Sequence, residues 1–555
     1  MSAFDCLLCF AAPQSVGASE VQWPLTITFL VAIVVTLYFA GKGLVYYGGQ
    51  KDDKTFFLMG GRLSSSGASA SHAAATMSLA TVFYFFLAFG KDFGIGLLIS
   101  PLTLVLGAWL FAKLLLPKLN ELHFFSEPRP STLAEFMRQL TGSRGVMYCI
   151  MGTTAIGMLS VVLIELFLGV SIFSMFFKQD LEASTHIEDW ALVILMTVAF
   201  VYTSFGGLKA VVSTDISQFT LMFVAMSLFF VWILWGAIEN PEQNISLASL
   251  APADLPLNKG ILLPYPLLVN MCIVNLLYAV CMLRTWLTIA AQPNLKEAER
   301  GIIGGAKRAA WVVVLLMLVG ILVFRVQFPD VGEPNIRVLL DRLVELPIHE
   351  SGNSGELPVP GNDSLDESAV QSTAGLWHNR VGSLVILPLF FAACLAALLS
   401  TVDSALLPIL QTFFHDLKIG KPPNGNQRPF FHIPFATFLL MIIALGLYFI
   451  VFRVLNIRLE SWLFTIFGFA ITTGPVLIFT ILLPKYYSSS RIFHFSIYLT
   501  IVGSLAIICT CSYLGNRNMN QDLVMWGSPL AIVFGCVIMT IGAMVIRQSQ
   551  NMERT

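Results

Sequence analysis

Long apolar runs recur along the whole chain, separated by shorter polar segments. A helix needs roughly 20 mainly apolar residues to cross a bilayer, so each run predicts a membrane span. The pattern predicts an all-α polytopic membrane protein with about 13 transmembrane helices. These are Pro24–Tyr47, Gly67–Phe89, Leu97–Leu116, Val146–Phe177, Trp190–Thr203, Val211–Trp235, Pro264–Thr288, Ala306–Phe328, Val381–Phe413, Phe430–Val454, Ser461–Lys485, Ile492–Tyr513 and Trp526–Ile546.

Composition supports a protein of the bilayer. Of 555 residues, 56% are hydrophobic and only 12% charged, about half the charge of a soluble domain. The net charge of −1 also argues against a nucleic-acid-binding protein, for which a basic surface is expected. Most cysteines lie inside apolar runs, which indicates core residues rather than a disulfide framework. Whether Cys6 and Cys9 pair in the N-terminal tail stays open.

The basic residues indicate an orientation. If the N-terminus lies outside, the cytoplasmic loops collect about 20 of the 32 Lys and Arg residues, as the positive-inside rule requires. An odd number of spans then places the C-terminus in the cytoplasm, and we expect the plasma membrane as the location. Glycosylation acceptor patterns at Asn244 and Asn362 fall outside; the sequence does not decide whether they are used.

The chain divides into three parts. Residues 1–60 form an extracellular tail, a first helix and an inner loop. Residues 61–490 form a ten-helix core that includes the long polar external loop 329–380, and residues 491–555 add two C-terminal helices with a short cytoplasmic tail.

Three polar clusters interrupt the apolar spans, where polar groups are costly. The first is the small-residue run Ser64–Ser78, which predicts either a tightly packed helix or one unwound in mid-membrane to coordinate an ion. The second is Phe205–Gln218, with a Gly-Gly turn followed by Asp215, which is either a helix-start carboxylate or part of a site. The third is Ala396–Ser404, where Asp403 needs a cation, a proton or a donor.

Together these clusters resemble the sodium:solute symporter family. The segments Thr132–Phe136 and Lys296–Ile302 also resemble family segments, and the resemblance runs in order from about Gly60 to Phe413. It implies an inverted-repeat core in which the first helix of each five-helix repeat is broken, here Gly67–Phe89 and Pro264–Thr288. Substrate and ion sites are then expected near the midplane, at the repeat interface.

The resemblance also implies the coupling ion, Na⁺, and its ligands. Five neutral oxygens suit such a hard cation. They are the carbonyls of Ala74, Met77 and Ala397 and the hydroxyls of Ser400 and Thr401. A second cation site is implied at Asp215, Ser400, Asp403 and Ser404. It would hold Na⁺ or be coupled to H⁺, and the sequence leaves both open.

The resemblance implies a small organic solute as substrate, contacted by the broken helices and the fourth span. The candidates are Thr76, Ser78, Thr81, Glu165, Asn275 and Tyr278. A lone Glu165 favours an amine-bearing or neutral solute, such as an amino acid or a sugar, unless it pairs with another helix or is protonated. Tyr278 is either a gate or an aromatic core residue. Relatives often carry Gln-Arg where Leu287-Thr288 stands, and Arg284 lies one turn earlier.

The function expected is therefore Na⁺-coupled symport of the solute into the cell by a protein embedded in the lipid bilayer. A symporter-like solute sensor without transport is the alternative. No nucleophile, base or metal constellation suggests an enzyme. The oligomeric state and the identity of the solute stay open.

Overall fold

The computed structural model describes residues 23–45, 53–79, 85–86, 89–126, 129–176, 184–239, 263–322, 381–416, 432–455, 457, 459–483 and 491–552. These residues form helices and short connections, with no strand among them. Ten of the described helical segments are long and apolar enough to cross a membrane. The all-α polytopic class is thus confirmed, whereas the number thirteen stays a prediction. Thr81, Cys6, Cys9, the loop 329–380 and both glycosylation patterns lie outside the described residues.

The longer helices follow one another along the chain, with several short 3₁₀ and π turns between them. In order they are α2 (Trp23–Val45), α3 (Asp53–Leu58), α4 (Ser65–Thr76), α5 (Phe89–Phe93), α6 (Ile99–Leu110), α7 (Leu116–Glu121), α8 (Leu133–Thr141), α9 (Arg144–Phe176), α10 (Ser184–Glu239), α11 (Tyr265–Cys281), α12 (Leu283–Ala291), α13 (Leu295–Ile321), α16 (Leu387–Asp416), α17 (His432–Tyr448), α18 (Leu459–Ile471), α19 (Gly474–Leu482), α20 (Arg491–Arg517) and α21 (Gln521–Met552).

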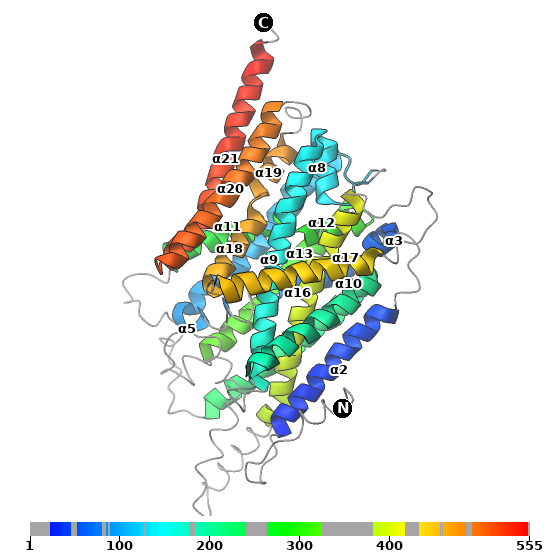
Figure 1. The fold of residues 1–555 in the computed structure, drawn as a ribbon, viewed down its shortest axis with the longest axis vertical. Coiled ribbons are helices and arrows are strands. Elements are labelled where there is room, and N and C mark those ends of the chain that lie inside the picture. The colour runs from blue at the N-terminus through cyan, green and yellow to red at the C-terminus, as the bar shows by residue number, and fades with distance from the viewer. Residues whose placement is uncertain are drawn as a thin grey trace, which may run out of the picture.

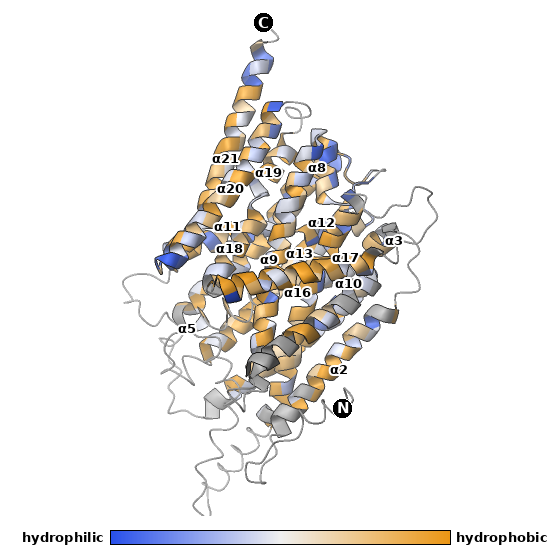
Figure 2. Cartoon of the chain, in the orientation of Figure 1, coloured by the Kyte–Doolittle hydropathy of each residue, from blue (hydrophilic) through white to orange (hydrophobic). Residues whose placement is uncertain are grey.

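The helices pack into one bundle with two flanking elements. Helix α2 lies along one side of it, against α10 and α16, and the α20–α21 hairpin lies along the other, against α18 (Figure 1). Apolar residues cover the length of the helices, whereas hydrophilic ones gather at α8 and at the ends of α21 (Figure 2). Many large apolar side chains on the outer helices are exposed, for example Leu102, Val231 and Phe435, as expected for a surface that faces lipid.

Both helices predicted to be broken are broken. Helix α4 ends at Thr76, and Met77 takes non-helical angles (φ −86°, ψ 71°). The later segment is interrupted at Met282 (φ −73°, ψ 121°), which separates α11 from α12. Helix α10 contains a third interruption at Gly207 (φ 56°, ψ −171°), a conformation that glycine adopts readily. The Gly-Gly turn between the predicted fifth and sixth spans therefore separates two helical parts of α10.

The close approach of α6 to α11 depends on Gly107. A Cβ atom at this position would lie 2.5 Å from the Asn275 carbonyl oxygen and 2.7 Å from the Leu276 Cα. Because these are backbone atoms, Gly107→Ala must push the two helices apart, and we expect a loss of about 2 kcal/mol in the free energy of unfolding. Gly152→Ala on α9, with nothing within 4 Å, is the matched control and should be neutral or slightly stabilising. Equal unfolding temperatures for the two variants would contradict this account.

Candidate functional site

The break in α4 leaves backbone groups for other partners. The Met77 N–H donates to the Ala74 carbonyl at 3.0 Å, which closes the helix after Thr76. Just beyond, the carboxylate of Glu165 on α9 accepts hydrogen bonds from the Ser78 hydroxyl and from the Leu79 N–H, the latter at 3.1 Å. A fully buried carboxylate thus stabilises the non-helical turn from outside. Glu165 therefore pairs with another helix, one of the alternatives that the sequence left open.

Helix α16 places its hydroxyls near this break. Ser400 donates to Asp215 Oδ1 at 2.8 Å, and Thr401 donates to the Ala397 carbonyl at 2.9 Å. Because both hydroxyl hydrogens are turned toward these acceptors, the oxygen lone pairs remain available for a cation. All five residues predicted as Na⁺ ligands are buried, with at most 4% of any of them exposed. Buried neutral oxygens fit a hard monovalent cation.

Asp215 connects three elements through its carboxylate. It accepts from Ser71 on α4 and from Ser400 on α16, and it forms an ion pair with Arg284 at 2.8 Å between Oδ2 and Nη2. Arg284 also donates to Ser71. The sequence did not predict this ion pair. An arginine inside the membrane needs a partner, however, and an intramembrane carboxylate such as Asp215 is the kind of side chain that could have been expected to pair with it.

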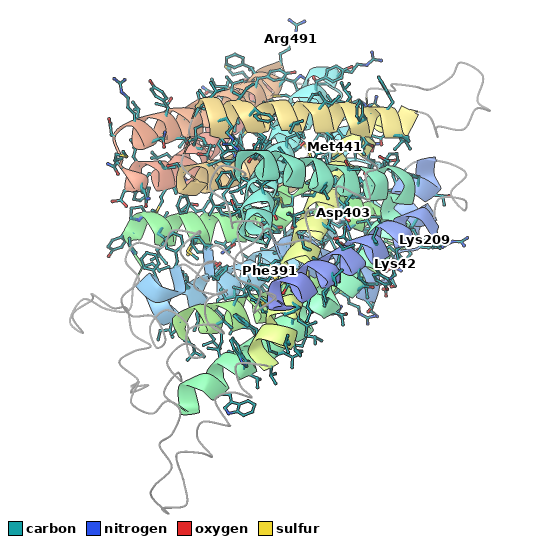
Figure 3. All side chains as sticks on the ribbon, turned by 60° about the horizontal axis from the view of Figure 1, so that its bottom comes forward. Lys42, Lys209, Phe391, Asp403, Met441 and Arg491 are labelled. Atoms are coloured by element: carbon teal, nitrogen blue, oxygen red, sulfur yellow. The ribbon has the colours of Figure 1, made fainter. Side chains whose placement is uncertain are left out.

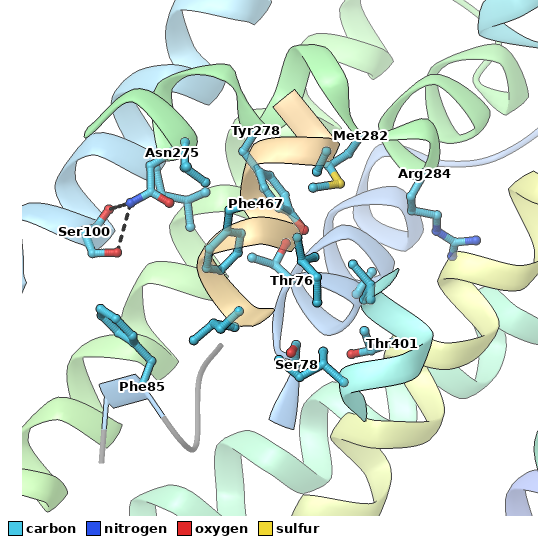
Figure 4. Close-up of a pocket in the computed structure, with 18 of the residues that line it drawn as sticks. Thr76, Ser78, Phe85, Ser100, Asn275, Tyr278, Met282, Arg284, Thr401 and Phe467 are labelled. Carbon is cyan, nitrogen blue, oxygen red and sulfur yellow. Dashed lines mark hydrogen bonds between the residues drawn. The ribbon is translucent and has the colours of Figure 1, made fainter. Parts of the chain in front are cut away.

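A buried pocket lies beside these groups, with a volume of about 130 Å³ (Figure 4). Of the predicted solute residues, Thr76, Ser78, Asn275 and Tyr278 line it, as do the predicted cation-site residues Thr401 and Ser404. Among the residues that the structure describes, Glu165, Asp215 and Asp403 are not part of this lining.

Two of the predicted solute-binding residues, Asn275 and Tyr278, lie against residues of other helices. Asn275 donates to the Ser100 hydroxyl at 3.0 Å and to the Ser100 carbonyl at 3.2 Å (Figure 4). It also donates to the Thr103 hydroxyl at 3.2 Å, and these bonds join α11 to α6. Tyr278 on α11 lines the pocket together with Thr76 on α4 (Figure 4). Much of the remaining wall is aromatic or aliphatic, including Phe85, Phe464 and Phe467. The sequence did not point to these residues, because phenylalanines inside apolar spans look alike whether they face lipid, core or pocket.

Asp403 lies in the interior of the bundle, fully buried on α16, which packs against α10 and α2. It is three residues from Ser400 and so lies about 60° around the helix from it. Figure 3 shows Asp403 inside the bundle and Lys42 and Lys209 near the same end of it.

Comparison with known proteins identifies the fold and the family. Residues 56–327 match the sodium:solute symporter family. This stretch of the chain belongs to that family. A solved Na⁺-coupled sialic acid symporter, in a substrate-bound outward-open state, is 16% identical; the match covers 94% of this chain and 98% of that one, with a TM-score of 0.65. No curated protein matches the chain.

A manganese transporter from Eremococcus coleocola is a more distant structural neighbour. It is 15% identical over 87% of this chain and 95% of that one, with a TM-score of 0.52. At these identities the neighbours show the transporter fold alone. The sodium:solute symporter family implies membrane embedding, a small solute and Na⁺ as the coupling ion. The comparisons give no support for H⁺.

The loop segment at Thr132 forms a second polar contact, outside the membrane-spanning segments. Thr132 caps α8 by accepting from the Glu135 N–H at 3.0 Å, and its hydroxyl lies 2.8 and 2.9 Å from the two carboxylate oxygens of Asp416. Burial raises the pKa of Asp416 to about 7, which the Thr132 hydrogen bond partly offsets; Glu135 raises this pKa further and Arg138 lowers it.

This contact predicts a pH dependence of stability. Because the pKa of Asp416 is higher in the folded chain than its usual value of 3.8, the contribution of Asp416 to stability is greatest below pH 4 and falls as the pH rises to about 7. The loss is at most about 4 kcal/mol. Asp416→Asn should flatten the profile of unfolding temperature between pH 4 and 7. If the variant and the wild type share the same slope over that range, Asp416 does not titrate as described.

Proposed function

We propose that the chain is a secondary active transporter of the plasma membrane that carries a small organic solute into the cell together with Na⁺. The N-terminus would lie outside and the C-terminus in the cytoplasm. The observation that carries this proposal is the break of α4 after Thr76 beside the hydroxyls of Ser400 and Thr401, at the edge of a buried pocket. Irregular backbone at membrane depth is typical of ion and substrate sites in transporters.

The proposed Na⁺ ligands are the carbonyls of Ala74, Met77 and Ala397 and the hydroxyls of Ser400 and Thr401. Three of the five residues belong to α16 and two to the end of α4. Na⁺ binding would therefore fix the α4 break against α16. Since Thr76, Ser78 and Thr401 line the pocket, the same step orders one of its walls, and the ion and the solute stabilise each other's binding.

The pocket lining favours a neutral solute over an amine-bearing one. No Asp or Glu is among the described residues that line it, and Glu165 is engaged by Ser78 and Leu79. Hydroxyl and amide groups, such as those of Thr76, Asn275 and Tyr278, would bind the polar part of the solute. The phenylalanines would cover its apolar part. A mainly apolar wall with a few placed polar groups is typical of small-molecule sites.

One Na⁺ supplies enough free energy for strong accumulation. A tenfold gradient contributes about 1.4 kcal/mol, and a membrane potential of about 100 mV contributes roughly 2.3 kcal/mol per charge. The sum, about 3.7 kcal/mol, supports roughly 500-fold accumulation of a neutral solute.

A thermal-shift screen of small neutral and amine-bearing solutes, with Na⁺ or choline as the cation, tests this function. We expect a solute that raises the unfolding temperature more in Na⁺ than in choline. That solute, radiolabelled, should then enter proteoliposomes down an imposed Na⁺ gradient. Binding without uptake would support the sensor instead. A solute bound and transported equally in both cations would contradict Na⁺ coupling.

A further inference from the structure

Arg284 is held inside the bundle by one acid. It is the second residue of α12, directly after the break at Met282, and its side chain is only 5% exposed. A positive charge at the N-terminus of a helix is opposed by the helix dipole. The local structure therefore does not favour arginine here. The Nη2 nitrogen of the guanidinium donates to Asp215 and to Ser71. The Nε and Nη1 nitrogens are buried and have no hydrogen-bond partner among the described residues.

The carboxylate of Asp215 is fully engaged by these contacts. Oδ1 accepts from Ser400, and Oδ2 accepts from Ser71 and Arg284. Its side chain has no exposed surface. The single negative charge is balanced by a guanidinium, which keeps its proton in proteins. The acid is therefore already neutralised by a cation that cannot leave.

Ser400 places this ion pair next to the proposed Na⁺ site. Its hydroxyl bonds Asp215 and is also a proposed Na⁺ ligand. A second Na⁺ beside Asp215 would add a positive charge close to both Arg284 and the first Na⁺. In a buried site of low effective dielectric, like charges at such separations repel strongly. The arrangement disfavours a second mobile ion beside Asp215.

We propose that Arg284 is a built-in cation that fills the place beside Asp215, so that the protein binds one Na⁺ and not two. The inference rests on the proposed Na⁺ symport and goes beyond it by fixing the number of coupling ions. It assigns Asp215 and Arg284 a positioning role: they hold Ser71, Ser400 and the start of α12 together without exchanging ions. Removing the guanidinium should convert the acid into a second Na⁺ site.

Equilibrium binding of ²²Na⁺ to the purified full chain in nanodiscs, with no solute added, tests the number of ions. We expect one Na⁺ per chain for the wild type and two for R284Q, whose carboxylate has lost its fixed cation. R284K keeps a fixed positive charge and should bind one. The double variant D215N/R284Q has neither charge and should also bind one.

T401A separates this inference from the proposed function. Thr401 belongs to the proposed Na⁺ site, and its hydroxyl donates to the Ala397 carbonyl rather than to Asp215. Failure of the proposed function would appear as no Na⁺ binding by the wild type, or as binding that T401A does not weaken. The one-ion inference would be overturned if the wild type bound two Na⁺, or if a folded R284Q bound only one.

The test does not depend on R284Q being folded. If R284Q aggregates during size-exclusion chromatography, the number of Na⁺ ions bound by the wild type and by D215N/R284Q still tests the inference. One Na⁺ in each supports the inference. Two in the wild type and one in the double variant would show that Asp215 binds a mobile cation despite Arg284.

Discussion

The double variant S400A/T401A is expected to lose Na⁺ binding, with an affinity at least about 100-fold lower than that of the wild type. Two of the five proposed ligands disappear, and a hydrogen-bond-like contact to a charged group contributes about 1.5–3 kcal/mol. Two such contacts exceed the roughly 2.8 kcal/mol that a 100-fold change requires. Na⁺-dependent thermal stabilisation and ²²Na⁺ binding measure the loss.

T412A is the matched control for this variant. Thr412 is also a buried hydroxyl of α16, and it donates to the Pro408 carbonyl of its own helix at 2.8 Å. It lies outside the proposed site, so its removal should leave the Na⁺ affinity unchanged. If S400A/T401A remained folded and kept the wild-type dependence on Na⁺, the ligand assignment would be wrong.

R284Q is expected to lower the free energy of unfolding by about 3–5 kcal/mol in Na⁺-free choline buffer. It leaves the fully buried carboxylate of Asp215 without its cation, and breaking one side of a buried ion pair carries a cost of this size. D215N should cost a similar amount, because it leaves the guanidinium unpaired. Chemical unfolding in detergent, followed by intrinsic fluorescence, gives the values.

The double variant D215N/R284Q completes the cycle. It leaves no buried charge uncompensated, so it should be more stable than either single variant, with a coupling of at least about 2 kcal/mol. Strictly additive costs would mean that the two side chains do not interact in solution. Because R284Q alone has a vacant carboxylate, Na⁺ should stabilise R284Q more than it stabilises the wild type or the double variant.

The sequence by itself determined the class of the protein. Apolar runs of membrane length, interrupted by few charges, leave helices as the practical way to satisfy the backbone in lipid. The run Ser64–Ser78 alone left a packed and an unwound helix open, and the resemblance to the sodium:solute symporter family implied both breaks. The α4 end at Thr76 and the interruption at Met282 confirm both. The ion ligands were implied by the same resemblance and remain to be tested.

Only the tertiary structure decided which polar groups meet. Glu165 and the Ser78–Leu79 turn are 86 or more residues apart, and Asp215 joins residues from α4, α12 and α16. Periodicity assigns a residue to a face of its own helix but does not say which helix that face meets. The sequence therefore left Glu165 open between a solute ligand and a partner of another helix, and the structure shows its carboxylate bonded to Ser78 and Leu79. Arg284 was noticed as an intramembrane charge, but its partner depends on how four helices pack around one carboxylate.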